Sequence, residues 1–300
     1  MKSACIIAIG DELLNGFTSD TNSQWIKEKL IDYRLEVAKS VVVPDNEKSI
    51  NDEVLSSLSF DVVFILGGLG PTHDDITKLV LSKTLNLSLE IDQTYKKRLI
   101  SSFENIDSIK KTLDSQCLTL KSFTPIDNGI GTALGITGKV KKTRFFVLPG
   151  VPKELKEMFT KIIFPDYFTI NKSSNTHTLK TTGITESKLY LMLKKDIEDN
   201  KNKYKFSFLP HFSGVNIRVS SKGKQGNLKY VVDKIKVKLG SYIYADNNDK
   251  LEYVISKKLT DKKLSISIAE SCTGGLLTKK LTDYSGSSKY LIGSIVAYSN

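Results

Sequence analysis

The sequence predicts an α/β protein that begins with a three-layer fold around a mostly parallel sheet, followed by a small α+β unit and a further α/β segment. Apolar runs alternate with helical patterns up to residue 87, an order typical of parallel sheets. Residues 171–250 follow the order βαββαβ instead. The net charge also changes, from −1 over residues 1–170 to +9 over 171–250 and +3 over 251–300. We therefore predict domains at 1–170, 171–250 and 251–300.

The composition is that of a soluble globular protein. The 300 residues are 40% hydrophobic and 26% charged, and no apolar run reaches the roughly 20 residues of a membrane helix. The apolar run at the N-terminus is short and suits a first strand better than a signal peptide. Three scattered cysteines, Cys5, Cys117 and Cys272, lack metal-ligand spacing. We expect neither a disulfide framework nor a zinc site, and a cytoplasmic location.

The first strand is predicted at residues 4–9. A loop with Gly10, Asp11 and Asn15 follows it, and Asp20 is then placed to cap a helix with Ile26 and Leu30 on one face. Ligands of open α/β sheets bind at the carboxyl ends of strands. This loop is therefore a candidate binding element.

A second strand is predicted at residues 37–43, and Asp45 is expected to cap the helix that follows. That helix would bury one stripe of apolar side chains: Ile50, Val54, Leu55 and Leu58. The third strand, Val62–Leu66, is apolar throughout, as expected of a strand covered on both faces. After it, helical spacing recurs at Ile76, Leu79, Val80 and Leu87.

Between the third strand and its helix lies a glycine-rich loop, Gly67-Gly68-Leu69-Gly70-Pro71. Such a loop lets backbone N–H groups approach an anion in front of a helix N-terminus. Asp74 and Asp75 follow at the expected helix start. These carboxylates either hold a divalent cation beside a phosphate or, more ordinarily, cap the helix and complement its dipole.

The rest of the first domain contains a polar excursion and one more strand–helix pair. Residues 90–122 are expected to be helical, with Tyr95, Leu99 and Phe103 on one face. A strand at 144–148 precedes a helix with proline at its first position. Its buried face is predicted to be Leu155, Met158, Phe159, Ile162 and Ile163.

Four stretches in this domain resemble signatures of the CinA (competence/damage-inducible protein A) family. They are G-D-E-L-L-N-G with D-T-N at 10–22, G-G-L-G-P-T-H-D-D-I-T at 67–77, Asn128 with G-T-A-L-G at 131–135, and L-P-G-V-P-K-E-L at 148–155. The N-terminal domain of that family has the molybdopterin-binding MoaB/Mog-like fold. Leu134 stands where the family pattern has proline, which is expected to change the rigidity of that loop.

The resemblance implies metal-dependent hydrolysis of the pyrophosphate of ADP-ribose or a related nucleotide. Asp45 and Asp75 would be catalytic, Asp74 and Asp75 would bind Mg²⁺ or Co²⁺, and a homodimer is expected. The substrate-binding residues would be Gly10, Asp11, Asn15, Asn22, Gly67, Gly68, Gly70, Thr72, Thr77, Gly131, Thr132 and Gly150. Two alternatives stay open: a domain that binds molybdopterin or a nucleotide without turnover, and a nucleic-acid-associated competence factor.

The middle domain resembles the KH-type domain of the same family. Its predicted elements are strands at 178–182, 204–208, 215–219 and 242–245, a helix opened by residues 183–187 and a second helical stripe over 228–239. The string Gly223-Lys224-Gln225-Gly226 matches G-x-x-G, but it follows a strand, whereas the nucleic-acid-binding loop joins two helices. We therefore do not expect nucleic acid as a partner.

The last segment resembles the start of the CinA C-terminal domain, a nicotinamide mononucleotide deamidase. A strand at 264–269 leads into A-E-S-C-T-G-G and a helix with Leu276, Leu277 and Leu281. The resemblance makes Ser271 the nucleophile and Tyr298 part of its activating apparatus, with Thr273, Gly274 and Gly275 binding substrate. The ordinary reading is a Ser or Thr helix cap.

This final domain is expected to be incomplete and inactive as a deamidase. The family's domain continues well beyond a Y-S-N string, with a lysine soon after it, whereas this sequence stops at Asn300. A last, ragged strand is expected at 296–299.

Overall fold

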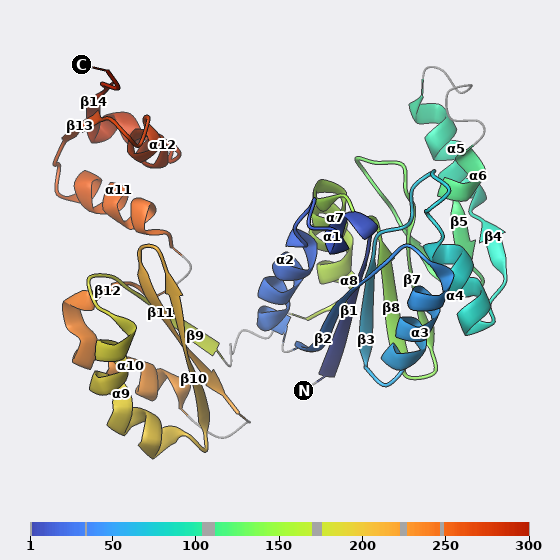
Figure 1. Ribbon diagram of the computed structural model, residues 1–300, viewed down its shortest axis with the longest axis horizontal. Helices are drawn as coiled ribbons and strands as arrows, with labels where there is room; N and C mark the ends of the chain where they lie inside the picture. The colour runs from blue at the N-terminus through green and yellow to red at the C-terminus, as the bar shows by residue number, and fades with distance from the viewer. Residues whose placement is uncertain are drawn as a thin grey trace. The chain divides into compact units, whose positions relative to one another are not determined.

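The computed structural model describes residues 2–33, 35–103, 112–169, 176–222, 227–246 and 249–299. It forms two compact units, Met1–Ser174 and Asn175–Asn300, called unit 1 and unit 2 below (Figure 1). Within the described ranges, no helix is both long enough and apolar enough to cross a membrane.

Unit 1 is built on a six-stranded sheet with the order β2-β1-β3-β8-β7-β6. These strands are Leu35–Val43, Lys2–Ile9, Val62–Leu66, Thr143–Leu148, Gly135–Val140 and Thr124–Ile126. The first four run parallel, whereas β7 is antiparallel to both β8 and β6. The predicted mostly parallel sheet is confirmed.

Helices cover both faces of this sheet, because side chains alternate along its buried strands. In β3, Val63 and Ile65 enter one core cluster and Phe64 and Leu66 the other. The first cluster is covered by α3 (Glu47–Ser57), α4 (Thr77–Leu85), α5 (Gln93–Ser102) and α6 (Leu113–Gln116). The second is covered by α2 (Thr21–Leu30), α7 (Pro152–Met158) and α8 (Phe164–Tyr167), as Figure 1 shows. A π-helical turn, Phe159–Ile163, joins α7 to α8.

The helix starts confirm one predicted cap and correct two. The Asp20 carboxylate accepts a hydrogen bond from the Ser23 N–H at 2.9 Å and caps α2 as expected. The cap of α3 is Asn46, not Asp45. Helix α4 begins at Thr77 with Ile76 at the cap position and no side-chain cap. Asp74 therefore lies in the loop before the helix and does not cap it.

Two apolar positions and one segment also differ from the expectation. Leu55 and Leu79 are 49% and 43% exposed, since the helices turn Val54 and Val80 inward instead. Residues 89–120 are not wholly helical: β4 (Leu89–Ile91) and β5 (Leu118–Leu120) form an antiparallel pair. The two strands are short and pair with each other across about 30 residues of sequence, so local apolar spacing does not predict them.

The first part of unit 2 is the predicted βαββαβ fold. A four-stranded antiparallel sheet has the order β10-β11-β9-β12. Its strands are Tyr204–His211, Gly214–Ser221, Thr176–Thr181 and Ile243–Ala245. Helices α9 (Glu186–Asn200) and α10 (Leu228–Leu239) bury their apolar faces against it. The G-x-x-G string at 223–226 lies outside the described residues.

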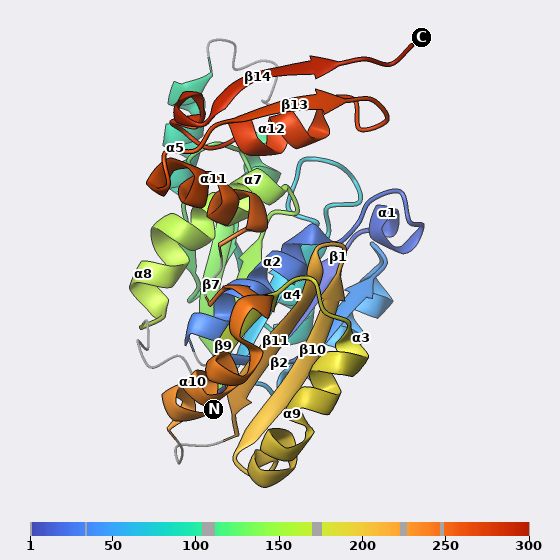
Figure 2. The ribbon, with the colours of Figure 1, turned by 90° about the vertical axis from the view of Figure 1, so that its left-hand side faces the viewer.

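The last part of unit 2 begins with helix α11 (Leu251–Asp261). The parallel strands β13 (Ile266–Glu270) and β14 (Leu291–Val296) follow, with helix α12 (Leu276–Thr282) packed alongside them (Figure 2). The expected strand at 296–299 is wrong, because β14 ends at Val296. The buried core here is small and consists of Ile268, Leu281 and Tyr290.

Candidate functional site

The loops after β1, β2, β3 and β8 meet at the carboxyl edge of the sheet in unit 1. The Gly10 N–H donates to the Val43 carbonyl at 3.1 Å, and the Gly67 N–H donates to the Leu148 carbonyl at 2.9 Å. A Cβ built on Gly150 would lie 3.5 Å from the Gly67 Cα. Three of the four predicted signatures, together with the loop that contains Asp45, therefore begin from one edge, as expected for ligand sites of parallel sheets.

Asp11 and Asp45 tie the first two loops together. The Asp11 N–H donates to Asp45 Oδ2 at 2.8 Å, and the Asp45 N–H donates to Asp11 Oδ1 at 3.4 Å. Asp11 opens the short helix α1 (Asp11–Leu14), whose last residue is followed by the exposed Asn15. Asp45 is thus turned toward the first loop, and this explains why Asn46 takes the capping position of α3.

Asp45 is a stronger base than an ordinary aspartate. Burial raises its pKa, and the negative charges of Asp11, Glu12 and Asp74 raise the pKa further, although the Asp11 N–H opposes the shift. These like charges come from the loops that follow β1 and β3, and Asp45 itself follows β2. The cluster therefore favours either a proton or a cation at Asp45.

The glycine-rich loop requires glycine at two positions. Gly67 and Gly68 have φ of 103° and 65°, which favour glycine. A Cβ on Gly67 would lie 2.3 Å from the Ile9 carbonyl oxygen, and one on Gly68 would lie 2.2 Å from Thr77 Oγ1. Buried Thr77 holds the loop, because its hydroxyl donates to the Gly67 carbonyl at 2.9 Å.

Gly68 and Gly70 present backbone N–H groups that form no hydrogen bond within the described residues. The Gly67 N–H differs, because it is bonded to Leu148. Such free donors near a helix N-terminus suit an anion. Gly68 and Gly70 are therefore the better candidates for phosphate contacts, while Gly67 shapes the loop.

Asp75 closes the same loop. Its Oδ2 accepts hydrogen bonds from the Thr72 N–H at 2.8 Å and from the Thr72 hydroxyl at 2.5 Å. A Cβ on Gly70 would lie 2.6 Å from this oxygen, so a side chain there would displace the carboxylate. Asp75 Oδ1 accepts no hydrogen bond within the described ranges and remains available to a ligand.

Asn22 joins the first motif to the last. It is 9% exposed, and its Nδ2 donates to the Gly150 carbonyl at 2.6 Å. Its Oδ1 has no partner among the described residues, which is uncommon for a buried polar atom. This acceptor beside the converging loops is consistent with a ligand-binding role.

Gly131 and Thr132 belong to a loop that Asn128 and Glu154 organise, two residues absent from the predicted site. Asn128 Oδ1 accepts from the Gly131 N–H at 2.9 Å, and its Nδ2 donates to Glu154 Oε2 at 2.7 Å. A Cβ on Gly131 would lie 2.2 Å from the Glu154 carboxyl carbon. Both residues stand in the quoted signatures, but the contact between them depends on the tertiary fold.

Leu134, in place of the family's proline, gains a backbone hydrogen bond. Its N–H donates to the Gln116 carbonyl at 3.2 Å, which proline cannot do. The side chain is fully buried. The substitution thus fixes the end of this loop by a bond instead of by a constrained φ.

The described residues contain no cluster of the side chains that most often bind metal ions. No group of three or more His, Cys, Asp or Glu side chains is placed to hold a metal ion among them. Mg²⁺, however, is commonly bound by one or two carboxylates together with substrate phosphates. The exposed Asp74 carboxylate and Asp75 Oδ1, which accepts no hydrogen bond within the described residues, are the oxygens that would serve such an open site.

In unit 2, the residues of the A-E-S-C-T-G-G motif lie at the carboxyl ends of β13 and β14. Ser271 and Tyr298 follow these paired strands closely, and the Ala297 N–H donates to the Glu270 carbonyl at 2.8 Å. Ser271 is exposed, and Tyr298 is 79% exposed. Within the described residues, no hydrogen bond joins the two side chains.

The N-terminus of α12 is occupied by Glu270, which sequence reasoning missed. Its carboxylate accepts from the N–H groups of Leu277 and Thr278, both at 2.9 Å, and from the Thr278 hydroxyl. Burial raises the Glu270 pKa, but these bonds outweigh it and lower the pKa to about 2. The cap position belongs to Gly275 (φ 93°), so the expected Ser or Thr cap is wrong.

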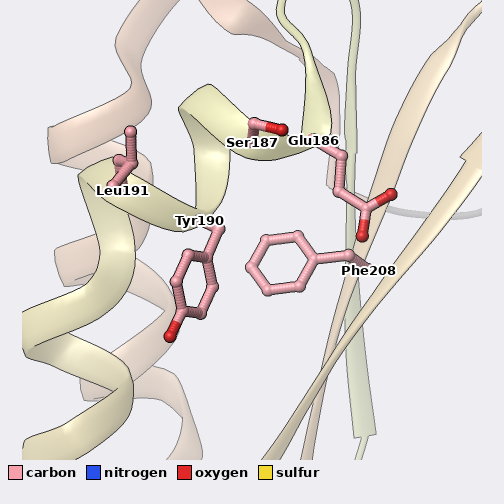
Figure 3. Close-up of a pocket in the computed structure, with 5 residues that line it drawn as sticks. All are labelled: Glu186, Ser187, Tyr190, Leu191 and Phe208. Atoms are coloured by element: carbon pink, nitrogen blue, oxygen red, sulfur yellow. The ribbon is translucent and has the colours of Figure 1, made fainter.

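A separate cavity of about 570 Å³ lies on the first turns of α9 in unit 2 (Figure 3). The Tyr190 and Phe208 rings meet edge to face, with centroids 6.3 Å apart. Glu186, Ser187 and Leu191 complete the lining. None of the residues that the sequence predicts to be catalytic, substrate-binding or metal-binding lines this cavity.

Three family models match successive stretches of the chain. Residues 5–168 match a family model described as a probable molybdopterin binding domain. Residues 176–245 match the damage-inducible protein CinA KH domain, and residues 248–300 match the CinA C-terminal domain.

Relatives that match along the whole of this chain share the description CinA-like protein. A CinA-like protein of Thermosipho melanesiensis is 35% identical over 303 residues, which cover 100% of this chain and 74% of that protein. One of Thermotoga maritima is 34% identical over 304 residues, with the same coverage. A crystal structure of the protein CinA, of unknown function, from Thermoplasma acidophilum is 31% identical with a TM-score of 0.51. It covers 55% of this chain and 97% of that one.

Proposed function

This chain belongs to the family of CinA-like proteins, and from that premise we propose that unit 1 hydrolyses the pyrophosphate bond of ADP-ribose or a related nucleotide with Mg²⁺ or Co²⁺. One observation carries the proposal. The unbonded N–H groups of Gly68 and Gly70 lie in the same short loop as Asp74 and Asp75, and Asp74 interacts with the base-like Asp45. Anion donors and carboxylates thus meet at one sheet edge.

The residues divide the work between binding and proton transfer. Gly68 and Gly70 donate to phosphate oxygens, while Thr72 and Thr77 hold the loop in shape. Asp45, with its raised pKa, accepts the proton of the attacking water. Cleavage of ADP-ribose by water yields AMP and ribose 5-phosphate. A cation held by Asp74 and Asp75 would supply positive charge to the phosphates.

The proposal is tested by incubating the protein with ADP-ribose and Mg²⁺ or Co²⁺, with and without chelator, and measuring AMP. We expect AMP that disappears with chelator. Asp45→Asn and Asp75→Asn should each lower the rate at least about 100-fold. Asp52→Asn, which removes an exposed charge on α3, is the matched control and should retain the rate.

Three results would contradict the proposal. Unchanged hydrolysis by Asp75→Asn would remove Asp75 from the mechanism, and chelator-resistant AMP would remove the cation. Nucleotide binding without AMP under either metal would favour a domain that binds a nucleotide or molybdopterin without turnover. The absence of a ready-made group of three metal ligands among the described residues is the observation that keeps this second function open.

The pH profile offers an independent check on Asp45. Protonated Asp45 cannot accept a proton, so kcat/KM should fall as the pH drops through the Asp45 pKa. In the metal-free chain, burial and like charges raise the Asp45 pKa, so an NMR titration without metal should show this carboxyl protonating at a higher pH than an ordinary aspartate. A carboxyl that titrates at or below the ordinary pKa of aspartate in the metal-free chain would contradict this account of Asp45.

We propose a homodimer in the cytoplasm, which suits the three free thiols Cys5, Cys117 and Cys272. In the C-terminal part, Ser271 remains the proposed nucleophile toward nicotinamide mononucleotide, with Tyr298, Thr273, Gly274 and Gly275 around it. Nucleic acid is not a proposed partner.

A further inference from the structure

The loop that carries Gly131 and Thr132 is held by Glu154, which belongs to a predicted motif, and by residues of helix α5, which belong to none. Tyr95 and Arg98 on helix α5 form hydrogen bonds with it, and Glu154 in the first turn of α7 does so too. The α5 segment lies in the polar excursion, for which the sequence indicates no function.

Arg98 on α5 binds the start of this loop with two nitrogens. One guanidinium nitrogen donates to Asp127 Oδ2 at 2.6 Å, and the other donates to the Asn128 carbonyl at 2.8 Å. The guanidinium also lies 4.6 Å from the centre of the Tyr95 ring. A planar fork of this kind fixes direction as well as distance.

Tyr95 binds the far end of the same loop. It is 5% exposed, and its hydroxyl donates to the Thr132 carbonyl at 3.3 Å. Tyr95 and Arg98 therefore hold the loop at both ends from a single helical turn. The side chain of Asn128 joins the loop internally, through the Gly131 N–H and the Ala133 carbonyl.

The Arg98–Asp127 ion pair is too exposed to contribute much to the stability of the fold. The Arg98 and Asp127 side chains are 39% and 54% exposed, and exposed pairs contribute only about 0–1 kcal/mol to stability. The Arg98 charge is already paired, so it is not a free phosphate ligand. Its consequence is geometric, because the two directed hydrogen bonds of Arg98 fix where the binding loop lies.

We propose that Arg98 and Tyr95 are positioning residues, which hold the Gly131–Thr132 loop in the shape that binds the nucleotide. The inference rests on the proposed function, since that function makes this loop part of the substrate site. The inference assigns a role to the segment between β4 and β5, because helix α5 in that segment holds the binding loop in place. Neither residue needs to touch the substrate.

The test compares Arg98→Ala and Tyr95→Phe with Lys97→Ala, an exposed neighbour on the same helix, in the full chain. Arg98→Ala should raise the KM for ADP-ribose about tenfold while kcat changes less than about twofold, which is the pattern of lost substrate binding. Hydrogen exchange of the Ile130 and Gly131 amides, both donors to Asn128 Oδ1, should accelerate. Trp25 fluorescence, from the single tryptophan, should give an unchanged unfolding midpoint.

A double-mutant cycle with Asp127→Ala separates positioning from general damage. If the Arg98–Asp127 contact does the positioning, the double variant should resemble each single variant in KM. Unchanged KM together with unchanged amide exchange in Arg98→Ala would overturn the inference. If the wild-type chain makes no AMP, the proposed function fails, and amide exchange alone then decides whether Arg98 and Tyr95 hold the loop.

Discussion

At the scale of single residues, burial and hydrogen bonding changed the roles that the sequence indicated. Asp45 and Asn46 are adjacent, and either is a good helix cap by residue type. The Asp11 N–H engages Asp45, so Asn46 caps α3. Glu270 is a similar case, since an acidic residue before a glycine turn became the acceptor for the α12 N-terminus.

Lys78 is a buried cation that the sequence pattern does not reveal. It is 4% exposed, and its Nζ has no hydrogen-bond partner among the described residues. Burial lowers its pKa from 10.5 to about 7, with the nearby Cys117 opposing the shift. The protonated form is therefore a cost to folding.

We predict that Lys78→Met stabilises unit 1 by about 2 kcal/mol near pH 7, because it replaces an unpaired buried ammonium by an apolar chain of similar length. Urea unfolding followed by Trp25 fluorescence measures this change.

The pH dependence of Lys78 supplies the control. The unfolded chain holds the lysine proton up to pH 10.5, whereas the folded chain loses it near 7. Wild-type stability should therefore rise with pH between 7 and 10.5, relative to Lys78→Met. Equal pH dependence in the two proteins would show that Lys78 keeps its ordinary pKa.

At the scale of elements, the strand–loop–helix unit of β3 and α4 depends on close approach of backbone. Gly67 meets the Ile9 carbonyl of the neighbouring strand, whereas Gly16, also with positive φ (76°), has nothing within 4 Å of its virtual Cβ. A residue with a side chain would strain the backbone at both positions, but only at position 67 would its Cβ also clash with the Ile9 carbonyl oxygen.

We predict that Gly67→Ala destabilises unit 1 by roughly 3 kcal/mol or more, because strain and overpacking combine. Gly16→Ala, the matched control, should cost about 1 kcal/mol from strain alone. The midpoint of urea unfolding by Trp25 fluorescence compares them. Equal losses would show that the loop relaxes away from Ile9.

At the scale of the molecule, the buried core clusters of the described residues separate into the same two units as the chain itself. The two large clusters of unit 1 contain only residues of Met1–Ser174, and those of unit 2 only residues of Asn175–Asn300. Each unit therefore buries its own apolar surface, which is what independent folding needs.

We predict that residues 1–174 alone fold with a thermal midpoint, by Trp25 fluorescence, within about 2 °C of the full chain. If the proposed function holds, this shorter chain should also keep its AMP-forming rate. A large drop in the midpoint would show that unit 1 depends on unit 2 for stability.

The sequence by itself determined the parallel sheet, the βαββαβ order of unit 2 and the family, which the comparisons confirmed. Those features are encoded locally, in apolar periodicity and in glycine, proline and carboxylate positions along one stretch of chain. The expected roles of the site residues remain predictions.

Only the tertiary structure decided which of these stretches touch. The β4–β5 pairing, the Asn128–Glu154 contact and the Arg98 fork join residues about 26 to 31 positions apart. Asp45 and Lys78 likewise owe their shifted pKa values to surroundings supplied by other segments. Hydrogen bonds and charge interactions act through space, so their partners depend on how the layers pack and not on spacing along the chain.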